Sequence, residues 1–216
     1  VRNRGLQAHA VRRERSDLGI AGPKLVRLDG SLDLACRRSF PTPEVSFWRM
    51  TYLSKIFPRS KLFGRYNMTY LDPNQPAEID AVVGAFLLVR RTAIEQAGLL
   101  DENFWMYGED LDWAYRIKQN GWKVYYYPQV VVRHVKRASS GQSNDGAAKA
   151  KYEFDRAMWL FYRKHYQARS SGFVDKWVRI GLGLKGGSKL RAEMHGKNRA
   201  KVASEKCEST ADSSQG

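Results

Sequence analysis

Two nearly continuous apolar runs place the strongest constraint on the fold of this chain. Residues 79–91 read IDAVVGAFLLVRR, and residues 122–135 read WKVYYYPQVVVRHV. Strands that are covered on both faces show such runs, whereas half-exposed strands alternate apolar and polar residues. We therefore expect buried strands in the first run, interrupted at Gly84, and one or two strands around Pro128 in the second.

Helical patterns occupy the stretches between and after these runs. We predict a helix over residues 109–119 and an aromatic-rich helix over residues 150–166. Thr92 and Glu95 have the spacing of a capping box, which predicts a further short helix. Strands and helices that alternate in this order predict an α/β fold with a mixed sheet.

Local composition divides the 216-residue chain into parts of different character. Residues 137–149 read RASSGQSNDGAAK, which is typical of a flexible linker. The expected organisation is a disordered basic arm over residues 1–16, a folded region over 17–166, a basic amphipathic segment over 167–195 and a disordered tail over 196–216.

The charge balance limits the classes of partner. The chain has 37 Lys and Arg against 22 Asp and Glu, which gives a formal net charge of +15. An excess of this size favours nucleic acid, an anionic membrane surface or phosphorylated small molecules. The cations are scattered or terminal, and no RNP-type, zinc-finger or KH-type pattern is present, so we expect no nucleic-acid partner.

The cysteines and the absence of targeting patterns indicate the compartment. Cys36 and Cys207 lie far apart, so neither a disulfide framework nor a cysteine metal site is expected. The first residues lack the apolar core of a signal peptide, and no apolar run is long enough to span a bilayer. A reducing, cytoplasmic location is the simplest interpretation.

The stretch GEDLDWAYR crowds three carboxylates into four positions, and two interpretations are open. As structural groups, Glu109 and Asp110 would interact with the N–H groups of a first helical turn, and Asp112 would pair with Arg116. As functional groups, one of them would be partly desolvated by an aromatic wall that includes Trp105, which raises its proton affinity. Such a carboxylate could remove the proton of a sugar hydroxyl.

His134 is a second candidate for chemistry. It ends the apolar run VVVRH in the second strand region. A lone histidine in a strand is more often structural. As a ligand of Mg²⁺ or Mn²⁺ it would need carboxylates from elsewhere in the chain.

A resemblance to a known family becomes specific at this point. The segments GIAGPKLVRLDGSLDLACRRSFPTP and VVGAFLLVRRTAIEQAGLLDENFWMYGEDLDWAYRIKQNGWKVYYYPQVVVRHV resemble the C-terminal half of family 2 glycosyltransferases. The rhamnosyltransferase-like and galactofuranosyltransferase-like branches are the most similar. The resemblance runs from about Asp17 to about Tyr166 and rests on the ordered combination of these blocks.

The resemblance implies a GT-A (Rossmann-like) fold and an enzyme of cell-surface polysaccharide assembly. Members of the family transfer a sugar from a nucleotide-diphosphate sugar, with inversion, to a glycan or a lipid-linked acceptor. A divalent cation, Mg²⁺ or Mn²⁺, neutralises the leaving diphosphate. The implied roles are general base for Asp110, acceptor binding for Trp105, Glu109 and Asp112, the donor–acceptor junction for Gly84 and Ala85, and metal binding for His134.

The sequence matches only part of the family pattern. No counterpart of the N-terminal half is present, and that half holds the nucleotide pocket and the metal-binding Asp-x-Asp motif. We therefore expect a partial GT-A domain from a truncated or fragmentary gene product, with little or no transfer by residues 1–216 alone. The alternative is a catalytically inactive remnant that binds carbohydrate or membrane.

The segment after residue 172 has two interpretations. Phe173, Trp177 and further apolar residues alternate with Lys and Arg, as in a helix that lies in a membrane interface. Such a helix would hold the protein peripherally on the inner face of the cell membrane, near lipid-linked acceptors. Four glycines between residues 181 and 187 weaken a helix, so a solvated basic tail is the alternative.

Overall fold

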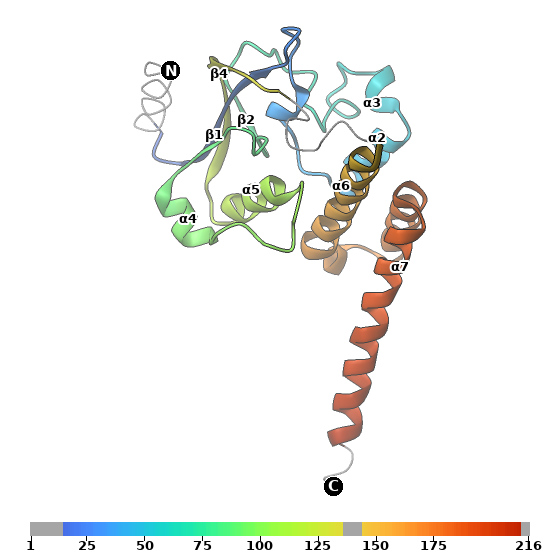
Figure 1. The fold of residues 1–216 in the computed structure, drawn as a ribbon. Coiled ribbons are helices and arrows are strands. Elements are labelled where there is room, and N and C mark those ends of the chain that lie inside the picture. The colour runs from blue at the N-terminus through green and yellow to red at the C-terminus, as the bar shows by residue number, and fades with distance from the viewer. Residues whose placement is uncertain (1–14, 136–143, 213–216) are drawn as a thin grey trace.

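A four-stranded mixed sheet and a series of helices make up the computed structural model, which describes residues 15–135 and 144–212 (Figure 1). The predicted α/β class with a mixed sheet is confirmed, in the form of a partial GT-A-like domain. In chain order the elements are β1 (Leu18–Val26), η1 (Leu34–Cys36), α2 (Pro43–Met50), α3 (Leu53–Ile56), β2 (Ala77–Ile79), β3 (Leu88–Val89), α4 (Arg91–Ala97), α5 (Glu109–Gln119), β4 (Lys123–Arg133), α6 (Asn144–His165), η2 (Gln167–Arg169) and α7 (Gly172–Asp212).

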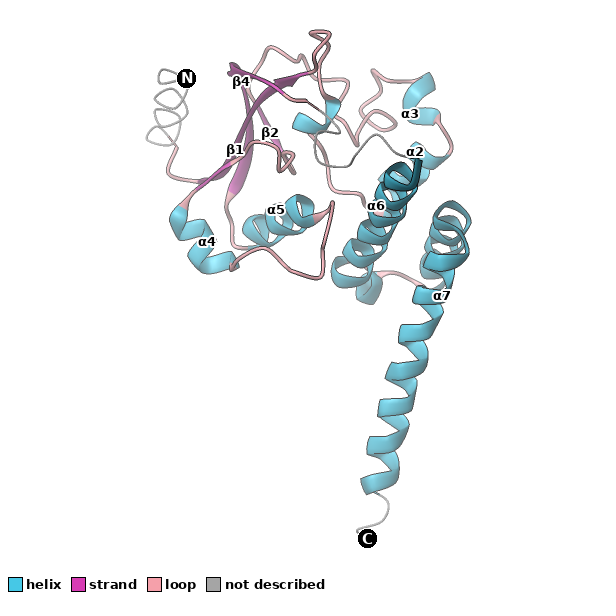
Figure 2. Ribbon diagram, in the orientation of Figure 1, coloured by secondary structure: helices cyan, strands magenta, loops and turns pink. Residues whose placement is uncertain are grey.

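The sheet has the strand order β2-β4-β1-β3. Figure 2 shows the strands gathered on one side of the molecule, with α6 and α7 on the other. The central strands β1 and β4 are parallel, while β2 and β3 join the edges in antiparallel orientation. The register between the central strands slips after Pro23, because Pro23 lies opposite Tyr127 and Lys24 lies opposite Val131. Pro128 falls in this slip, as expected for a residue that cannot donate to a ladder. The second apolar run is therefore one irregular strand.

The first apolar run forms much less strand than expected. Only β2 and β3, at its two ends, pair with the sheet, and the residues between them form turns and a single bridge. That bridge joins Ala81 to Arg38, and the N–H of Gly84 donates to the side chain of Asp110. Side chains and a bridge thus satisfy backbone groups that a continuous strand would have paired. As a result the expected strand becomes a loop beside the carboxylate cluster.

The main core lies between the sheet and α5. Ile20 and Val124 of the central strands pack in one buried cluster with Leu111 and Ile117 of α5. Phe161 of α6 belongs to the same cluster, so this core also includes α6, which α5 contacts. The hydrophobic face of α5 thereby fixes the position of its first turn, which carries the carboxylates.

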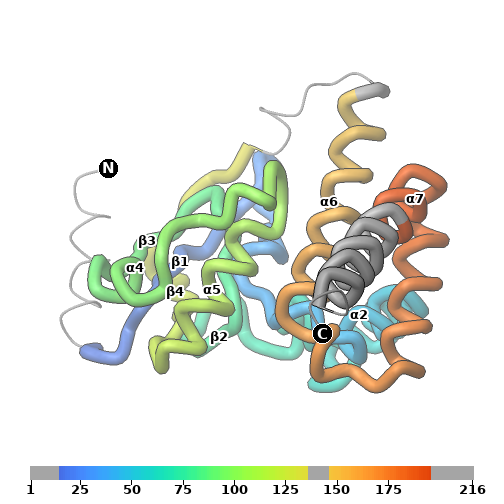
Figure 3. Tube along the Cα trace, turned by 90° about the horizontal axis from the view of Figure 1, so that it is seen from below, coloured from blue at the N-terminus to red at the C-terminus, as the bar shows by residue number. Residues whose placement is uncertain are grey.

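Helices α6 and α7 lie side by side and share a second core (Figure 3). Trp159 and Tyr162 of α6 pack against Leu190 and Met194 of α7. Helix α7 changes direction at Gly187, whose backbone is non-helical, and its distal part projects away from the fold (Figure 1). Helix α7 ends at Asp212, past residue 195 where we expected regular structure to stop.

Helix boundaries follow the sequence expectations in part. Helix α5 has the predicted bounds, but the proposed capping box before α4 is wrong. Arg90 is the N-cap of α4 and makes no side-chain cap, while Glu95 pairs with Arg91. Helix α6 begins at Asn144, inside the expected linker; the preceding linker residues and most of the basic arm lie outside the described residues.

Gly22 gives a direct test of the packing between β1 and the loop that follows β2. A Cβ atom on Gly22 would overlap the side chain of Val82, and both residues are buried. Gly22→Ala should lower the free energy of unfolding by about 1–3 kcal/mol, the usual cost of overpacking a core. Urea unfolding measures this change. Gly172→Ala is the matched control, because that Cβ meets no atom within 4 Å, and an equal loss in both variants would contradict the packing described here.

Candidate active site

A strained turn places the carboxylate cluster at the start of α5. Tyr107 and Gly108 both have positive φ, at 67° and 80°. A Cβ atom on Gly108 would lie 3.0 Å from the Cβ of Ala157 in α6, so glycine suits this position for both its conformation and its small size. A positive φ at a tyrosine is uncommon and marks backbone that the surrounding structure holds in place.

Asp110 is buried, with 6% of its surface exposed, and its two carboxylate oxygens differ. The Oδ2 atom accepts hydrogen bonds of 2.7 Å from the backbone N–H of Gly84 and from Nη2 of Arg38. The Oδ1 atom is buried and has no hydrogen-bond partner among the described residues. One oxygen is therefore fixed in orientation, while the other retains its capacity to accept a proton.

Arg38 is the residue that the sequence interpretation missed. Its backbone pairs with Ala81, and its Nη2 also donates to the carbonyl oxygen of Val82 at 2.7 Å. Burial opposes its charge, but Asp110 and Tyr66 outweigh this effect and raise the pKa of Arg38 further. The only signal in the sequence was the pair Arg37-Arg38 before a Pro-containing segment, which is not distinctive in so basic a chain.

Glu109 has an unusual environment beside Asp110. Burial and the neighbouring Asp110 charge raise the pKa of Glu109, and its Oε2 atom is buried without a hydrogen-bond partner among the described residues. The desolvation that we expected from the sequence thus acts on Glu109. A Cβ atom on Gly84 would lie 3.5 Å from Oε1 of Glu109 and 3.7 Å from Oδ2 of Asp110, so Gly84 adjoins both carboxylates.

The remaining candidates near the cluster lie at the surface. Trp105 is 60% exposed, and Nζ of Lys149 lies 4.5 Å from the centre of its ring. Tyr107 packs edge-on against Phe154, with ring centres 6.0 Å apart. Ala85 is exposed in the turn that follows Gly84. The structure therefore brings Gly84, Glu109 and Asp110 together and leaves Trp105 and Ala85 accessible to a ligand.

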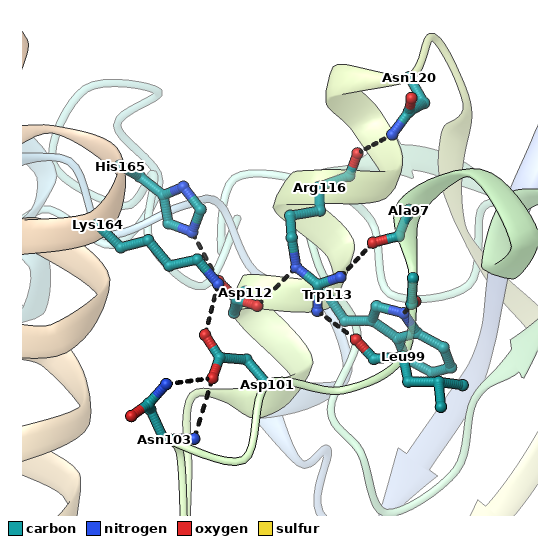
Figure 4. A network of polar contacts seen from close by, with 11 residues as sticks. Ala97, Leu99, Asp101, Asn103, Asp112, Trp113, Arg116, Asn120, Lys164 and His165 are labelled. Atoms are coloured by element: carbon teal, nitrogen blue, oxygen red, sulfur yellow. Dashed lines mark hydrogen bonds and ion pairs between the residues drawn. The ribbon is translucent and has the colours of Figure 1, made fainter.

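Asp112 faces the opposite way and is fully buried in a network of cations (Figure 4). Its Oδ2 atom lies 2.8 Å from Nε of Arg116, which confirms the pairing predicted from their spacing. Its Oδ1 atom lies 2.8 Å from Nζ of Lys164 and 2.7 Å from Nε2 of His165, both at the end of α6. These two contacts join α5 to α6 and could not be read from the local sequence.

The network extends from Asp112 to the loop before α5. Burial by itself would raise the pKa of Asp112, but hydrogen bonds from His165, Lys164 and Arg116 outweigh it, so the pKa lies below its usual value. Lys164 also contacts Asp101, and this hydrogen bond is the main cause that lowers the pKa of Asp101 to about 2. Arg116 donates to the carbonyl oxygens of Ala97 and Leu99. Asp112 therefore holds three parts of the fold together.

His134 lies beside a carboxylate but does not belong to a metal-binding group among the described residues. Its Nδ1 atom lies 2.8 Å from Oδ2 of Asp33, a fully buried carboxylate that also caps η1. Within residues 15–135 and 144–212, no group of three or more His, Cys, Asp or Glu side chains is arranged to hold a metal ion. The described residues therefore do not form the expected site for Mg²⁺ or Mn²⁺.

Comparison with known proteins finds a family match over most of the residues that form the candidate site. Residues 66–151, which include Gly84, the carboxylate cluster and His134, match the sequence model of the glycosyltransferase-like family 2. This part of the chain is therefore similar to the family 2 glycosyltransferases, and the aligned part is similar to a rhamnosyltransferase.

Two curated relatives from Mycobacterium tuberculosis, of strains CDC 1551 / Oshkosh and ATCC 25618 / H37Rv, are each an N-acetylglucosaminyl-diphospho-decaprenol L-rhamnosyltransferase. Each is 33% identical to this chain over 125 residues, which covers 57% of the chain and 39% of the relative. The chain thus spans about two fifths of the length of these relatives.

The Asp112 network predicts a large difference between two ion pairs of the same spacing. Asp112→Ala removes a fully buried carboxylate that Arg116, Lys164 and His165 all contact, so it should lower the free energy of unfolding by about 3 kcal/mol. Glu95→Ala removes the exposed partner of Arg91, so it should change stability by less than about 0.5 kcal/mol. Thermal and urea unfolding of both variants give the comparison. Equal effects would show that the network contributes no more than a surface pair.

Proposed function

We propose that this chain forms the acceptor side of an inverting glycosyltransferase in which Asp110 is the general base. The observation that supports this role is the state of its carboxylate, with Oδ2 held by Gly84 and Arg38 and Oδ1 buried without a partner. The family match supports a nucleotide-diphosphate sugar as donor and a glycan or lipid-linked acceptor. The name of the curated relatives supports a lipid diphosphate as the carrier.

The proposed reaction is a single displacement at the anomeric carbon. The acceptor hydroxyl oxygen attacks this carbon on the face opposite the leaving diphosphate, and the hydroxyl proton moves to Oδ1 of Asp110. The new glycosidic bond forms as the bond to the diphosphate breaks, so the configuration inverts without a covalent intermediate on the protein. The hydroxyl must come within about 3 Å of Oδ1 for this transfer.

The neighbours of Asp110 have distinct parts in this proposal. Arg38 and the Gly84 N–H are positioning groups, because two charge-assisted hydrogen bonds fix the carboxylate plane. Oδ1 is covered in this structure, so acceptor binding has to displace part of its surroundings. The exposed turn at Gly84 and Ala85, at the proposed donor–acceptor junction, adjoins the carboxylates and lacks large side chains.

Glu109 and Trp105 are the proposed acceptor contacts. The raised pKa of Glu109 favours the protonated form more than in an ordinary glutamate, and that form can donate a hydrogen bond to a sugar oxygen. The exposed Trp105 ring offers an apolar face for sugar C–H groups. The resemblance implied that Asp112 contacts the acceptor directly. Its contacts with Arg116 and Lys164 favour another role, in which Asp112 holds α5 in position.

We further propose that α7 contacts an anionic membrane surface. Val178 and Leu182 face inward against α6, whereas Phe173, Trp177, Ile180 and Leu184 are exposed at helical spacing. An apolar stripe on a basic chain matches the requirements of an interfacial helix. Within the part of the chain that the structure describes, no helix has the length and apolar character needed to cross a bilayer.

The role of Asp110 predicts a large loss of transfer on an isosteric substitution. Asp110→Asn keeps the size of the side chain but removes the base, so the rate of sugar transfer should fall about 10²–10⁴-fold. Single-turnover transfer to a lipid-linked acceptor, with the 216-residue protein in excess, measures this even when turnover is slow. Glu95→Gln is the control, because the side chain of Glu95 in α4 is exposed and lies outside the carboxylate cluster.

The same assay separates the two interpretations of Asp110. An Asp110→Asn variant that unfolds like the wild type and transfers no sugar supports the base. Measurable wild-type transfer that Asp110→Asn leaves unchanged would instead rule out Asp110 as the base. In that case Asp110 would serve only as the ion-pair partner of Arg38.

The α7 stripe predicts a specific loss of membrane binding. Phe173→Ala with Trp177→Ala should reduce co-sedimentation with phosphatidylglycerol vesicles by at least about tenfold, because burying each large apolar side chain is worth about 1.5–3 kcal/mol. Leu99→Ala with Leu100→Ala is the control, since these residues are also exposed but lie between α4 and α5. Similar binding by the two double variants would rule out the stripe as the contact.

A further inference from the structure

A cavity of about 820 Å³ lies between α2, α3 and the following segment on one side and α6 and α7 on the other. It is separate from the carboxylate cluster and was not indicated by the sequence. Its apolar lining includes Met50, Phe154, Met158, Leu182 and Leu184. A cavity of this size lined by flexible methionine and leucine side chains suits a long apolar chain.

The charged residues of the cavity are all cations. Arg49, Lys55 and Lys185 line it, and among the described residues no Asp or Glu does. Arg49 lies over the rings of Tyr66 and Phe154, at 4.3 Å and 5.6 Å from their centres. Among the residues that the structure describes, no carboxylate forms an ion pair with Arg49. A guanidinium held by two rings and lacking a counter-charge is well suited to bind a phosphate group.

Lys55 and Lys185 supply the other positive charges of the cavity. Nζ of Lys55 lies 4.9 Å from the ring centre of Tyr52. Nζ of Lys185 lies 3.3 Å from Oδ1 of Asp155, whose other oxygen contacts Lys151, so one carboxylate is shared by two cations. The cavity therefore combines an apolar interior with an excess of positive charge, which is the complement of an amphiphile with an anionic head.

Two features connect the cavity to the rest of the molecule. Tyr66 lines the cavity, and its carbonyl oxygen accepts a hydrogen bond of 2.8 Å from the backbone of Ser39, the residue after Arg38. Arg38 in turn holds Asp110. On the outer side, Leu184 belongs both to the cavity lining and to the exposed stripe of α7. The cavity thus adjoins the proposed membrane contact through Leu184 and is linked through Tyr66 and Ser39 to the segment that carries Arg38.

We propose that this cavity binds a lipid diphosphate, with Arg49, Lys55 and Lys185 contacting the phosphates and the apolar residues contacting an isoprenoid-type chain. The proposal rests on the proposed function, because it assigns a place to the lipid carrier of the acceptor. Gly181 lines the cavity beside Met50, and a Cβ atom there would lie 2.9 Å from Cε of Met50, whose side chain would have to move.

Isothermal titration calorimetry of the 216-residue protein tests this assignment with farnesyl diphosphate, inorganic pyrophosphate and farnesol. Farnesyl diphosphate should bind at least about tenfold more tightly than either of the other two, because only it uses both parts of the cavity. Pyrophosphate binding as tightly as farnesyl diphosphate would mean a free-anion site, and equal binding of farnesol would mean an apolar pocket only. Either result overturns the proposal.

Two substitutions locate the binding. Arg49→Ala should raise the Kd for farnesyl diphosphate about tenfold, the usual effect of losing one charged hydrogen bond. Arg59→Ala is the matched control, because Arg59 is an exposed arginine of the neighbouring segment that does not line the cavity, and it should leave the Kd within about twofold. If Arg49→Ala unfolds, the Kd of Lys55→Ala is compared with that of Arg59→Ala instead, because Lys55 is exposed and its substitution should not disturb the fold.

Variants of Arg49 and Lys55 that bind like Arg59→Ala would overturn the assignment. The titration contains no sugar donor and measures no transfer. Its failure would therefore leave the role of Asp110 standing, and failure of the Asp110 substitution to affect transfer would leave the binding result standing.

Discussion

The anchoring of one carboxylate oxygen of Asp110 is the interaction on which the functional account depends. Gly84 and Arg38 come from segments far apart in the chain, and both contact Oδ2. If Arg38 engaged both oxygens, Asp110 would be a structural ion-pair partner. Because Oδ1 has no partner among the described residues, the side chain combines a fixed orientation with an unused acceptor. This asymmetry distinguishes Asp110 from a carboxylate that only caps a helix.

Helix α5 uses neighbouring carboxylates for different purposes because of its periodicity. Asp110 and Asp112 are two residues apart, so they point to different sides of the helix. Asp110 faces the loop that contains Gly84, whereas Asp112 faces the cations of α6 and its own helix. The buried network around Asp112 fixes α5 against α6, and this in turn fixes the first turn that carries Asp110. Stability and the candidate chemistry are thus separated within a single turn.

Sequence reasoning succeeded for the local features of α5 and failed for contacts between residues far apart in the chain. The bounds of α5 and the pairing of Asp112 with Arg116 follow from helical spacing and are confirmed. Arg38, 72 residues before Asp110, and His165, 53 residues after Asp112, leave no periodic signal. The run from residue 79 to 91 was interpreted as strand because its composition is apolar, but tertiary contacts at Arg38 and Asp110 convert its centre into a loop. The cavity beside α7 likewise arises from elements distant in sequence.

Chemical rescue tests the central claim most directly. In Asp110→Ala the missing base can be replaced by a small carboxylate, so the single-turnover rate of sugar transfer is measured as a function of formate concentration. The account predicts a rate far below wild type without formate and a saturable increase as formate is added. A rate equal to that of the wild-type protein in the absence of formate would contradict it.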